Sequence, residues 1–176
     1  NNNIEEIVEV IASNKAQYVI NFAAQSMVGQ SWDNPHHWYE TNLVSFSRLI
    51  KGIQEKTKIE KFVQFSTPEV YGSTDNWIVE NFNFSPTTPY AISRAASDFH
   101  LEAIRKHSGF PVIFTRAANV FGPGQQIYRI IPKAVIAGLN GRKIQLHGGG
   151  ESLRSFIHIA DVSDALLKII ENGLVG

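Results

Sequence analysis

The sequence predicts an α/β protein in which helices flank a parallel sheet. Short apolar runs alternate with amphipathic helical patterns from Ile4 to Arg116, an order typical of parallel sheets. Three of these runs are short, and each leads into small or polar residues, as buried strands do. After Pro123 the helix and strand patterns become smaller, which indicates a second, C-terminal lobe.

The first half of the chain alternates regularly. Apolar residues from position 4 to 11 share one helical face, and residues 18–22 form the first apolar strand pattern. Asn34-Pro35 predicts a cap and a first-turn proline for a helix that runs to about Glu55. Residues 62–66 predict the second strand.

The remaining elements follow from caps and turns. Residues 72–88 are polar and predict an exposed loop, after which Thr88-Pro89 begins a helix that ends near Ser108-Gly109. Residues 112–116 predict the third strand. The C-terminal lobe is expected to contain helices over 131–139 and from about 162, and strands over 143–146 and 154–159.

Composition excludes several classes of protein. The 176 residues suffice for one ordinary core, and their zero net charge argues against a nucleic-acid partner or an anionic membrane surface. No apolar stretch approaches the roughly 18 residues that span a bilayer. The lack of cysteine fits a cytoplasmic location. The chain opens on Asn1 without a methionine, so we expect a piece of a longer protein.

The candidate site lies where the predicted strands end, because ligands of open parallel sheets bind beyond the carboxyl ends of the strands. The first strand leads into Ala23-Ala24-Gln25-Ser26, the second into Thr67-Pro68-Glu69 and the third into Ala117-Ala118-Asn119. The paired alanines suit a place where a flat ring lies against the backbone.

Tyr90 and Arg94 are four residues apart on a predicted helix and therefore share one face. A free phenol has a pKa of about 10, and a fixed cation nearby lowers it and favours the phenolate. Arginine supplies charge and bidentate hydrogen bonds but cannot relay a proton. The alternative is an ordinary surface pair, which spacing alone favours. The presence of Thr67 and Glu69 at a strand end favours a site.

Together these motifs resemble the extended short-chain dehydrogenase/reductase superfamily and, within it, the nucleotide-sugar 4,6-dehydratases. The segment from Ser66 to Gly72, Ser-Thr-Pro-Glu-Val-Tyr-Gly, is similar to the dehydratase motif Ser-Thr-Asp-Glu-Val-Tyr-Gly. Tyr90 to Arg94 matches Tyr-x-x-x-Lys with the last residue changed. The segments 21–26, 119–123 and 148–156 resemble the family's nicotinamide, sugar-nucleotide and phosphate segments.

The resemblance implies a partial Rossmann-like, doubly wound sheet over residues 1–122 and part of a sugar-nucleotide-binding lobe over 123–176. It implies NAD as cofactor and a lyase that converts an NDP-hexose, similar to dTDP-glucose, into a 4-keto-6-deoxy sugar nucleotide. The implied catalytic residues are Thr67, Glu69, Tyr90 and Arg94. The implied cofactor-binding residues are Ala23, Ala24, Gln25, Ser66, Tyr90 and Arg94. The implied substrate-binding residues are Asn119, Arg129 and Arg154.

Three departures from the family pattern bear on this expectation. Pro68 replaces an aspartic acid that protonates the leaving hydroxyl, and Arg94 replaces lysine. The Gly-x-x-Gly-x-x-Gly loop that holds a pyrophosphate at a helix N-terminus does not occur before Ile4. We therefore expect this segment alone to bind NAD weakly and to be inactive.

Other polar features have ordinary explanations. The glycines at 148–150 favour a tight turn over a phosphate loop. Arg154 is equally compatible with a phosphate contact and with an exposed strand position, and Arg129 has weaker support. No metal is expected, because His36 and His37 are adjacent on a helix and point in different directions. Asn42 either supports the strand ends through hydrogen bonds or faces solvent.

Two other functions remain open. A sugar-nucleotide 4-epimerase needs Tyr90 and a cation but no base for C5, so Glu69 favours the dehydratase. A non-catalytic binding or assembly module fits the missing glycine loop and Arg94. The resemblance further implies a homodimer that pairs through the helices at 34–55 and 89–107.

Overall fold

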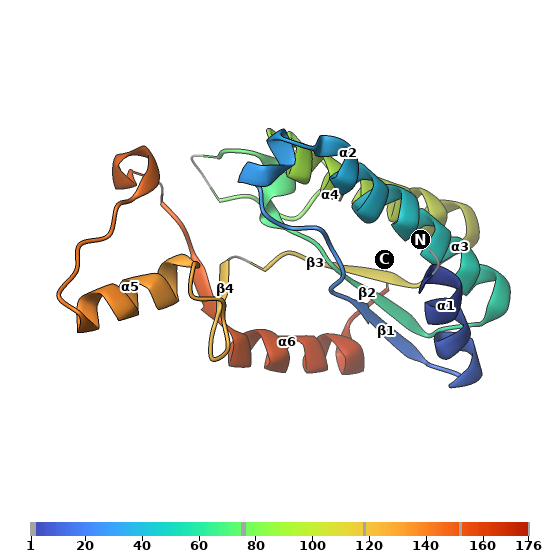
Figure 1. Cartoon of the computed structure of the whole chain (residues 1–176). Helices are drawn as coiled ribbons and strands as arrows, with labels where there is room; N and C mark the ends of the chain where they lie inside the picture. Colours follow the sequence, from blue (N-terminus) through green and yellow to red (C-terminus); the bar gives the residue numbers. More distant parts are fainter. Residues whose placement is uncertain (1–2, 75–76, 118, 152, 176) are drawn as a thin grey trace. The chain divides into compact units, whose positions relative to one another are not determined.

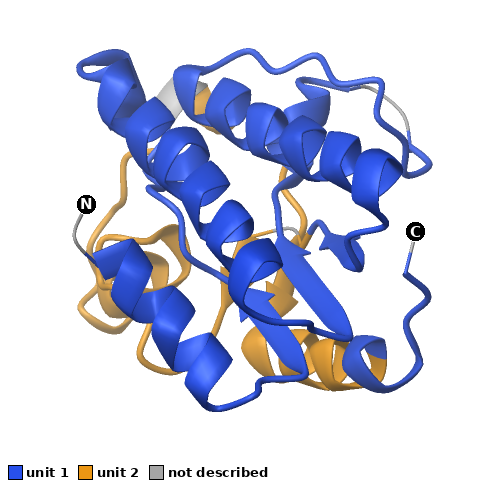
Figure 2. Ribbon diagram, turned by 90° about the vertical axis from the view of Figure 1, so that its right-hand side faces the viewer, with its two compact units in different colours: residues 1–116, 169–176 blue, residues 117–168 orange. Residues whose placement is uncertain are grey.

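The computed structural model describes residues 3–74, 77–117, 119–151 and 153–175. It confirms the α/β class, with parallel sheets and helices (Figure 1). The chain divides into two compact units, residues 1–116 with 169–176, and residues 117–168 (Figure 2). The functional division expected between residues 122 and 123 stays a prediction.

The sheet of unit 1 consists of β1 (Tyr18–Asn21), β2 (Lys61–Phe65) and β3 (Val112–Thr115), in that order and all parallel. Asn21 pairs with Gln64, and Gln64 pairs with Phe114. The three strands therefore end at the same edge, as the candidate site requires.

The core of unit 1 lies between this sheet and its helices, which are α1 (Asn3–Ser13), α2 (Pro35–Tyr39), α3 (Phe46–Lys56) and α4 (Pro89–Ser108). Figure 1 shows α3 and α4 on one face of the sheet. Phe62 of the central strand packs against Phe46 and Phe110, with ring centroids 6.3 and 5.6 Å apart. Gly52 lets α1 approach α3, since a Cβ there would lie 2.7 Å from Val8 Cγ2.

The helix at residues 34–55 is the first correction to the expected elements. It runs as α2, then a π-helical segment η2 (Glu40–Ser45), then α3. A π segment accommodates one extra residue in a helix and is frequent at functional sites. Here it carries the buried residue Asn42.

Helix α4 agrees with the expected bounds because its caps are local. Thr88 Oγ1 accepts a hydrogen bond from the Ala91 N–H at 3.1 Å, and Pro89 occupies the first turn. At the other end Gly109 has φ of 70° and donates its N–H to the Arg105 carbonyl at 2.8 Å. Side-chain capping and a left-handed glycine satisfy the unpaired groups at helix ends.

Unit 2 contains the other corrections. Residues 142–146, which the structure describes, lack regular structure, so the strand expected at 143–146 is wrong. The strand expected at 154–159 is shortened to β5 (Phe156–His158), and it pairs in parallel with an unexpected strand, β4 (Asn119–Phe121). The backbone N–H and carbonyl groups of a strand need such a partner. Local sequence propensity does not predict which distant segments will pair. The unit also contains α5 (Ile130–Leu139), η4 (His147–Gly150) and the start of α6 (Ile159–Asn172).

Gly72 closes the short helix that follows β2. Its φ of 73° and ψ of −157° suit glycine alone, and a Cβ would lie 2.3 Å from the Ser85 carbonyl oxygen. We expect Gly72→Ala to lower the free energy of unfolding by about 1–3 kcal/mol or more, measured by urea unfolding. Gly29→Ala is the control, since no atom lies within 4 Å of that Cβ. Equal effects of the two changes would contradict the strain at Gly72.

Among the described residues, no helix has both the length and the apolar character needed to cross a membrane.

Candidate active site

A buried pair of side-chain amides holds the start of the loop that follows β1. Asn21 Nδ2 donates to Gln64 Oε1 at 2.9 Å, and Asn21 Oδ1 accepts from the Ala23 N–H at 3.2 Å. Ala23 and Ala24 are exposed and Gln25 is half-buried. The loop thus presents small side chains and backbone at the sheet edge.

Asn42 fixes this loop to α4. Its Oδ1 accepts from the Gln25 N–H at 2.7 Å, and its Nδ2 donates to the Gln25 carbonyl at 3.0 Å and to Ser93 Oγ at 2.9 Å. Ser93 in turn donates to the Tyr90 carbonyl at 2.7 Å. The structure therefore confirms that Asn42 supports a strand end, and it connects that strand end to the helix that carries Tyr90.

We expect Asn42→Ala to lower the free energy of unfolding by about 1–3 kcal/mol, because the backbone N–H and carbonyl of the half-buried Gln25 and the buried Ser93 hydroxyl lose their partner. Chemical denaturation measures the change. Asn14→Ala serves as the control, since Asn14 makes an exposed bond to the Val10 carbonyl, and it should cost no more than about 0.5 kcal/mol. A loss at Asn42 as small as that at Asn14 would show that the bridge is dispensable.

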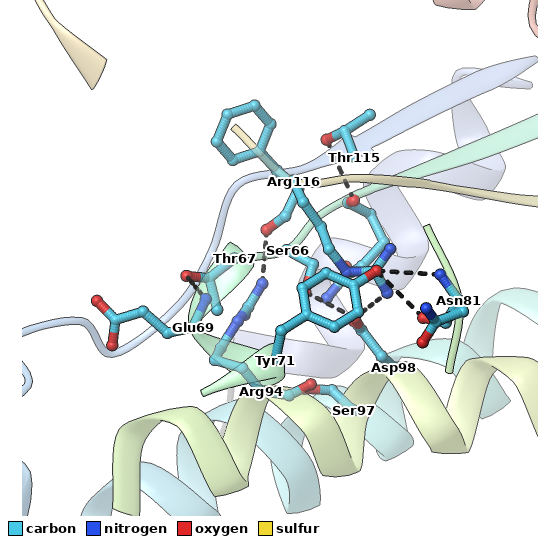
Figure 3. A network of polar contacts seen from close by, with 12 residues as sticks. Ser66, Thr67, Glu69, Tyr71, Asn81, Arg94, Ser97, Asp98, Thr115 and Arg116 are labelled. Atoms are coloured by element: carbon cyan, nitrogen blue, oxygen red, sulfur yellow. Dashed lines mark hydrogen bonds and ion pairs between the residues drawn. The ribbon is translucent and has the colours of Figure 1, made fainter. Parts of the chain in front are cut away.

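The end of β2 is followed by a short 3-10 helix, η3 (Pro68–Tyr71). Thr67 caps it, with Oγ1 accepting from the Glu69 N–H at 3.3 Å. Proline suits the first position because no N–H is needed there. Thr67 is buried, Glu69 is half-buried and η3 packs against α4. Figure 3 shows the Glu69 side chain extending away from the buried polar side chains around Arg94.

Tyr90 and Arg94 lie one turn apart near the start of α4. Tyr90 is half-buried, and its N–H donates to Ser31 Oγ at 3.2 Å. Arg94 is only 2% exposed, and its Nη2 donates to the Phe65 carbonyl at 2.5 Å. Burial lowers the pKa of Arg94, and the neighbouring Tyr90 and Asp98 side chains oppose that shift. The expected contact of Arg94 with a ribose stays a prediction.

Asp98 and Arg116 form a buried ion pair that the sequence reading missed. Asp98 is fully buried, and its Oδ2 accepts from Arg116 Nη2 at 2.9 Å and from Ser66 Oγ at 2.7 Å (Figure 3). Burial raises the pKa of Asp98, while the bond from Ser66 and the charges of Arg116 and Arg94 act against the rise. The four-residue spacing of Arg94 and Asp98 could have placed Asp98 on the same helix face as Arg94, but it does not indicate the pairing with Arg116.

The predicted substrate-binding residues all belong to unit 2. Asn119 begins β4, is exposed, and donates from Nδ2 to the Ser155 carbonyl at 2.9 Å. Arg129 precedes α5 and lies 5.8 Å from the Tyr128 ring centroid, while Arg154 is exposed ahead of β5. Their contacts with a nucleotide remain predictions.

Unit 2 also contains a hollow of about 410 Å³ between the β4 end and α5. Its lining is mostly apolar and includes Phe121, Ile131 and Val135. His158 also lines it and meets the Phe121 ring edge-on at 5.3 Å.

The fold and the strand-end residues together define an α/β protein with a candidate site at the carboxyl ends of a parallel sheet. The NAD dependent epimerase/dehydratase family model matches residues 2–176, so the chain belongs to this family. The dTDP-D-glucose 4,6-dehydratase of Homo sapiens is 35% identical over 163 residues, which cover 92% of this chain and 46% of that protein.

Solved structures of dehydratases and epimerases are similar to this chain. The dTDP-glucose 4,6-dehydratase of Streptomyces venezuelae, crystallised with NAD, has a TM-score of 0.86 and 30% identity, covering 98% of this chain and 54% of that one. The UDP-glucose 4-epimerase of Thermotoga maritima has a TM-score of 0.81 and 28% identity, covering 95% and 56%. The Rossmann-like expectation is confirmed. The chain spans about half the length of these relatives.

Proposed function

We propose that the intact protein catalyses the NAD-dependent 4,6-dehydration of an NDP-hexose. The observation that carries the proposal is that η3, which bears Glu69 and is capped by Thr67, packs against the helix that bears Tyr90. The relatives named dTDP-glucose 4,6-dehydratase support the reaction class.

The described residues fit the nicotinamide end of NAD. Ala23 and Ala24 are exposed and small, so a flat ring can lie against the backbone there. Gln25 completes that loop, and Ser66 and Tyr90 come from the neighbouring strand end and from α4. Bound NAD would supply the hydride acceptor at C4 and the hydride donor at C6.

The side chains of the chain would then move the protons. Tyr90 takes the proton of the 4-hydroxyl, and Thr67 donates a hydrogen bond to the same oxygen. Once C4 is a ketone, the C5 proton becomes acidic and Glu69 removes it. Water then leaves from C6. Pro68 has no proton to give, so Glu69 or a water molecule protonates the leaving hydroxyl.

Asn119, Arg129 and Arg154 would hold the nucleotide diphosphate. Guanidinium groups fork onto phosphate oxygens, and both arginines are exposed and able to do so.

Sugar-nucleotide 4-epimerization is the second candidate, favoured by the likeness to the Thermotoga enzyme. An epimerase would need Tyr90 but not Glu69.

The test is to titrate the intact protein with NAD, incubate it with dTDP-glucose and UDP-glucose, and identify the products by mass and NMR. A 4-keto-6-deoxy product supports the proposal. A C4 epimer of unchanged mass would refute the dehydratase proposal in favour of a 4-epimerase. A lack of affinity for NAD would refute both enzyme functions in favour of a non-catalytic binding module.

We also propose that the protein is a cytoplasmic homodimer that pairs through the helical segments of residues 34–55 and 89–107. Ile92 and Phe99, both on α4, have exposed apolar side chains, which supports an interface on this helix. A monomeric mass for the intact protein by sedimentation would overturn the dimer.

A further inference from the structure

Arg116 follows β3 and reaches into the protein interior, where it meets Asp98. The exposed fractions of the two side chains are 9% and 0%. One carboxylate oxygen of Asp98 serves both Arg116 and Ser66. Ser66 immediately precedes Thr67, the cap of η3, so the ion pair holds the chain two residues before η3 begins.

The guanidinium of Arg116 also lies among four aromatic rings. Its Cζ is 5.5 Å from the ring centroid of Tyr71, 5.8 Å from Phe82, 5.1 Å from Phe84 and 5.6 Å from Phe114. Rings within about 6 Å of a cation attract it through their quadrupoles. Tyr71 is the last residue of η3, so the same guanidinium holds the residue at the other end.

The segment 77–87 is folded back onto η3 by hydrogen bonds. The Tyr71 hydroxyl donates to the Asn81 carbonyl at 3.1 Å and accepts from the Asn81 N–H at 3.2 Å. The Ser85 N–H donates to the Val70 carbonyl at 3.0 Å. These bonds keep Phe82 and Phe84 beside the guanidinium.

We propose that Asp98 and Arg116 are positioning residues that fix η3 at both ends and thereby set the orientation of Glu69. Neither touches the reacting atoms. Asp98 acts through Ser66, before η3, and Arg116 acts through Tyr71, at its end. This inference rests on the proposed dehydration, because it assigns to the pair the geometry of the step at C5.

Arg116→Lys tests the inference, since lysine keeps the charge but loses the flat face and the fork of donors. A displacement of about 1 Å costs on the order of 100-fold in rate. We expect exchange of the C5 proton with solvent deuterium to slow about 10- to 100-fold, with oxidation at C4 and KM unchanged. Arg105→Lys is the matched control, because Arg105 also pairs with a carboxylate, that of Glu102 on α4, but its side chain is more exposed than that of Arg116.

A second measurement does not depend on catalysis. Amide hydrogen exchange at Asn81 and Ser85 should accelerate in Arg116→Lys and stay unchanged in Arg105→Lys. Phe84→Leu, which removes the nearest ring and leaves the ion pair, should give the same pattern if the lysine variant does not fold.

The positioning role would be overturned if Arg116→Lys slowed the C4 and C5 steps equally, or if it slowed neither step. Unchanged amide exchange in both Arg116→Lys and Phe84→Leu would overturn it as well, whatever the activity. A wild-type protein without any 4-keto-6-deoxy product would instead refute the proposed function, while the amide exchange would still report whether the pair anchors η3.

Discussion

Replacement of Glu69 by glutamine is expected to abolish formation of the 4-keto-6-deoxy sugar nucleotide and to leave oxidation at C4 intact. Glutamine cannot accept the C5 proton, and loss of a general base costs about 10²- to 10⁴-fold in rate. The local structure should survive, because Thr67 Oγ1 accepts its hydrogen bond from the backbone N–H of residue 69, which the substitution keeps. Single-turnover measurements of NADH absorbance and product formation separate the two steps.

Glu80→Gln is the matched control, since Glu80 is an exposed carboxylate of the following segment. It should leave both steps unchanged. Undiminished product formation by Glu69→Gln would refute the assignment of Glu69 as the C5 base, and loss of C4 oxidation in that variant would assign it to the first step instead.

Asp98→Ala is expected to produce the largest loss of stability. The change leaves the buried guanidinium of Arg116 and the hydroxyl of Ser66 without their acceptor, and removal of one partner from a buried ion pair costs about 3–5 kcal/mol. Urea unfolding of the intact protein measures it. A cost below about 1 kcal/mol, the usual value for an exposed pair, would contradict the buried geometry.

Asp98→Asn separates the charge of Asp98 from its hydrogen bonds. Burial raises the pKa of Asp98 in the folded state above its ordinary value of 3.8. At pH values between 3.8 and this raised pKa, the native state therefore binds more protons than the unfolded state. The contribution of Asp98 to stability therefore falls as pH rises through this window. The amide variant keeps an acceptor oxygen and should cost far less than alanine at pH 7. Its stability relative to wild type should rise from pH 4 to pH 7, and the opposite slope would show that the pKa is lowered.

Elements that depend on local chemistry could be predicted from the sequence. Thr88-Pro89 and Gly109 defined α4 because caps act within one turn of the helix end. Thr67 and Glu69 were found because a polar pair directly followed an apolar strand pattern. The π segment around Asn42 was missed because one extra residue barely changes the helical periodicity of residues 34–55.

Features that depend on pairing between distant segments could not be predicted. The strand expected at 143–146 lacked a partner, whereas three residues at 119–121 became β4 because β5 lies beside them. The alternative of an ordinary surface pair is wrong for Arg94, whose guanidinium is buried against the Phe65 carbonyl. The pairing of Asp98 with Arg116 likewise requires α4 and the end of β3 to be packed together.

The most direct test of the account is to run the reaction of the intact protein in D₂O with an NDP-glucose that carries deuterium at C4. If Tyr90 and Glu69 act on the same hexose as proposed, the product will be a 4-keto-6-deoxy sugar nucleotide with the C4 label transferred to C6 and one solvent deuterium at C5. A product without solvent deuterium at C5, or a sugar that keeps its C6 hydroxyl, would contradict the account.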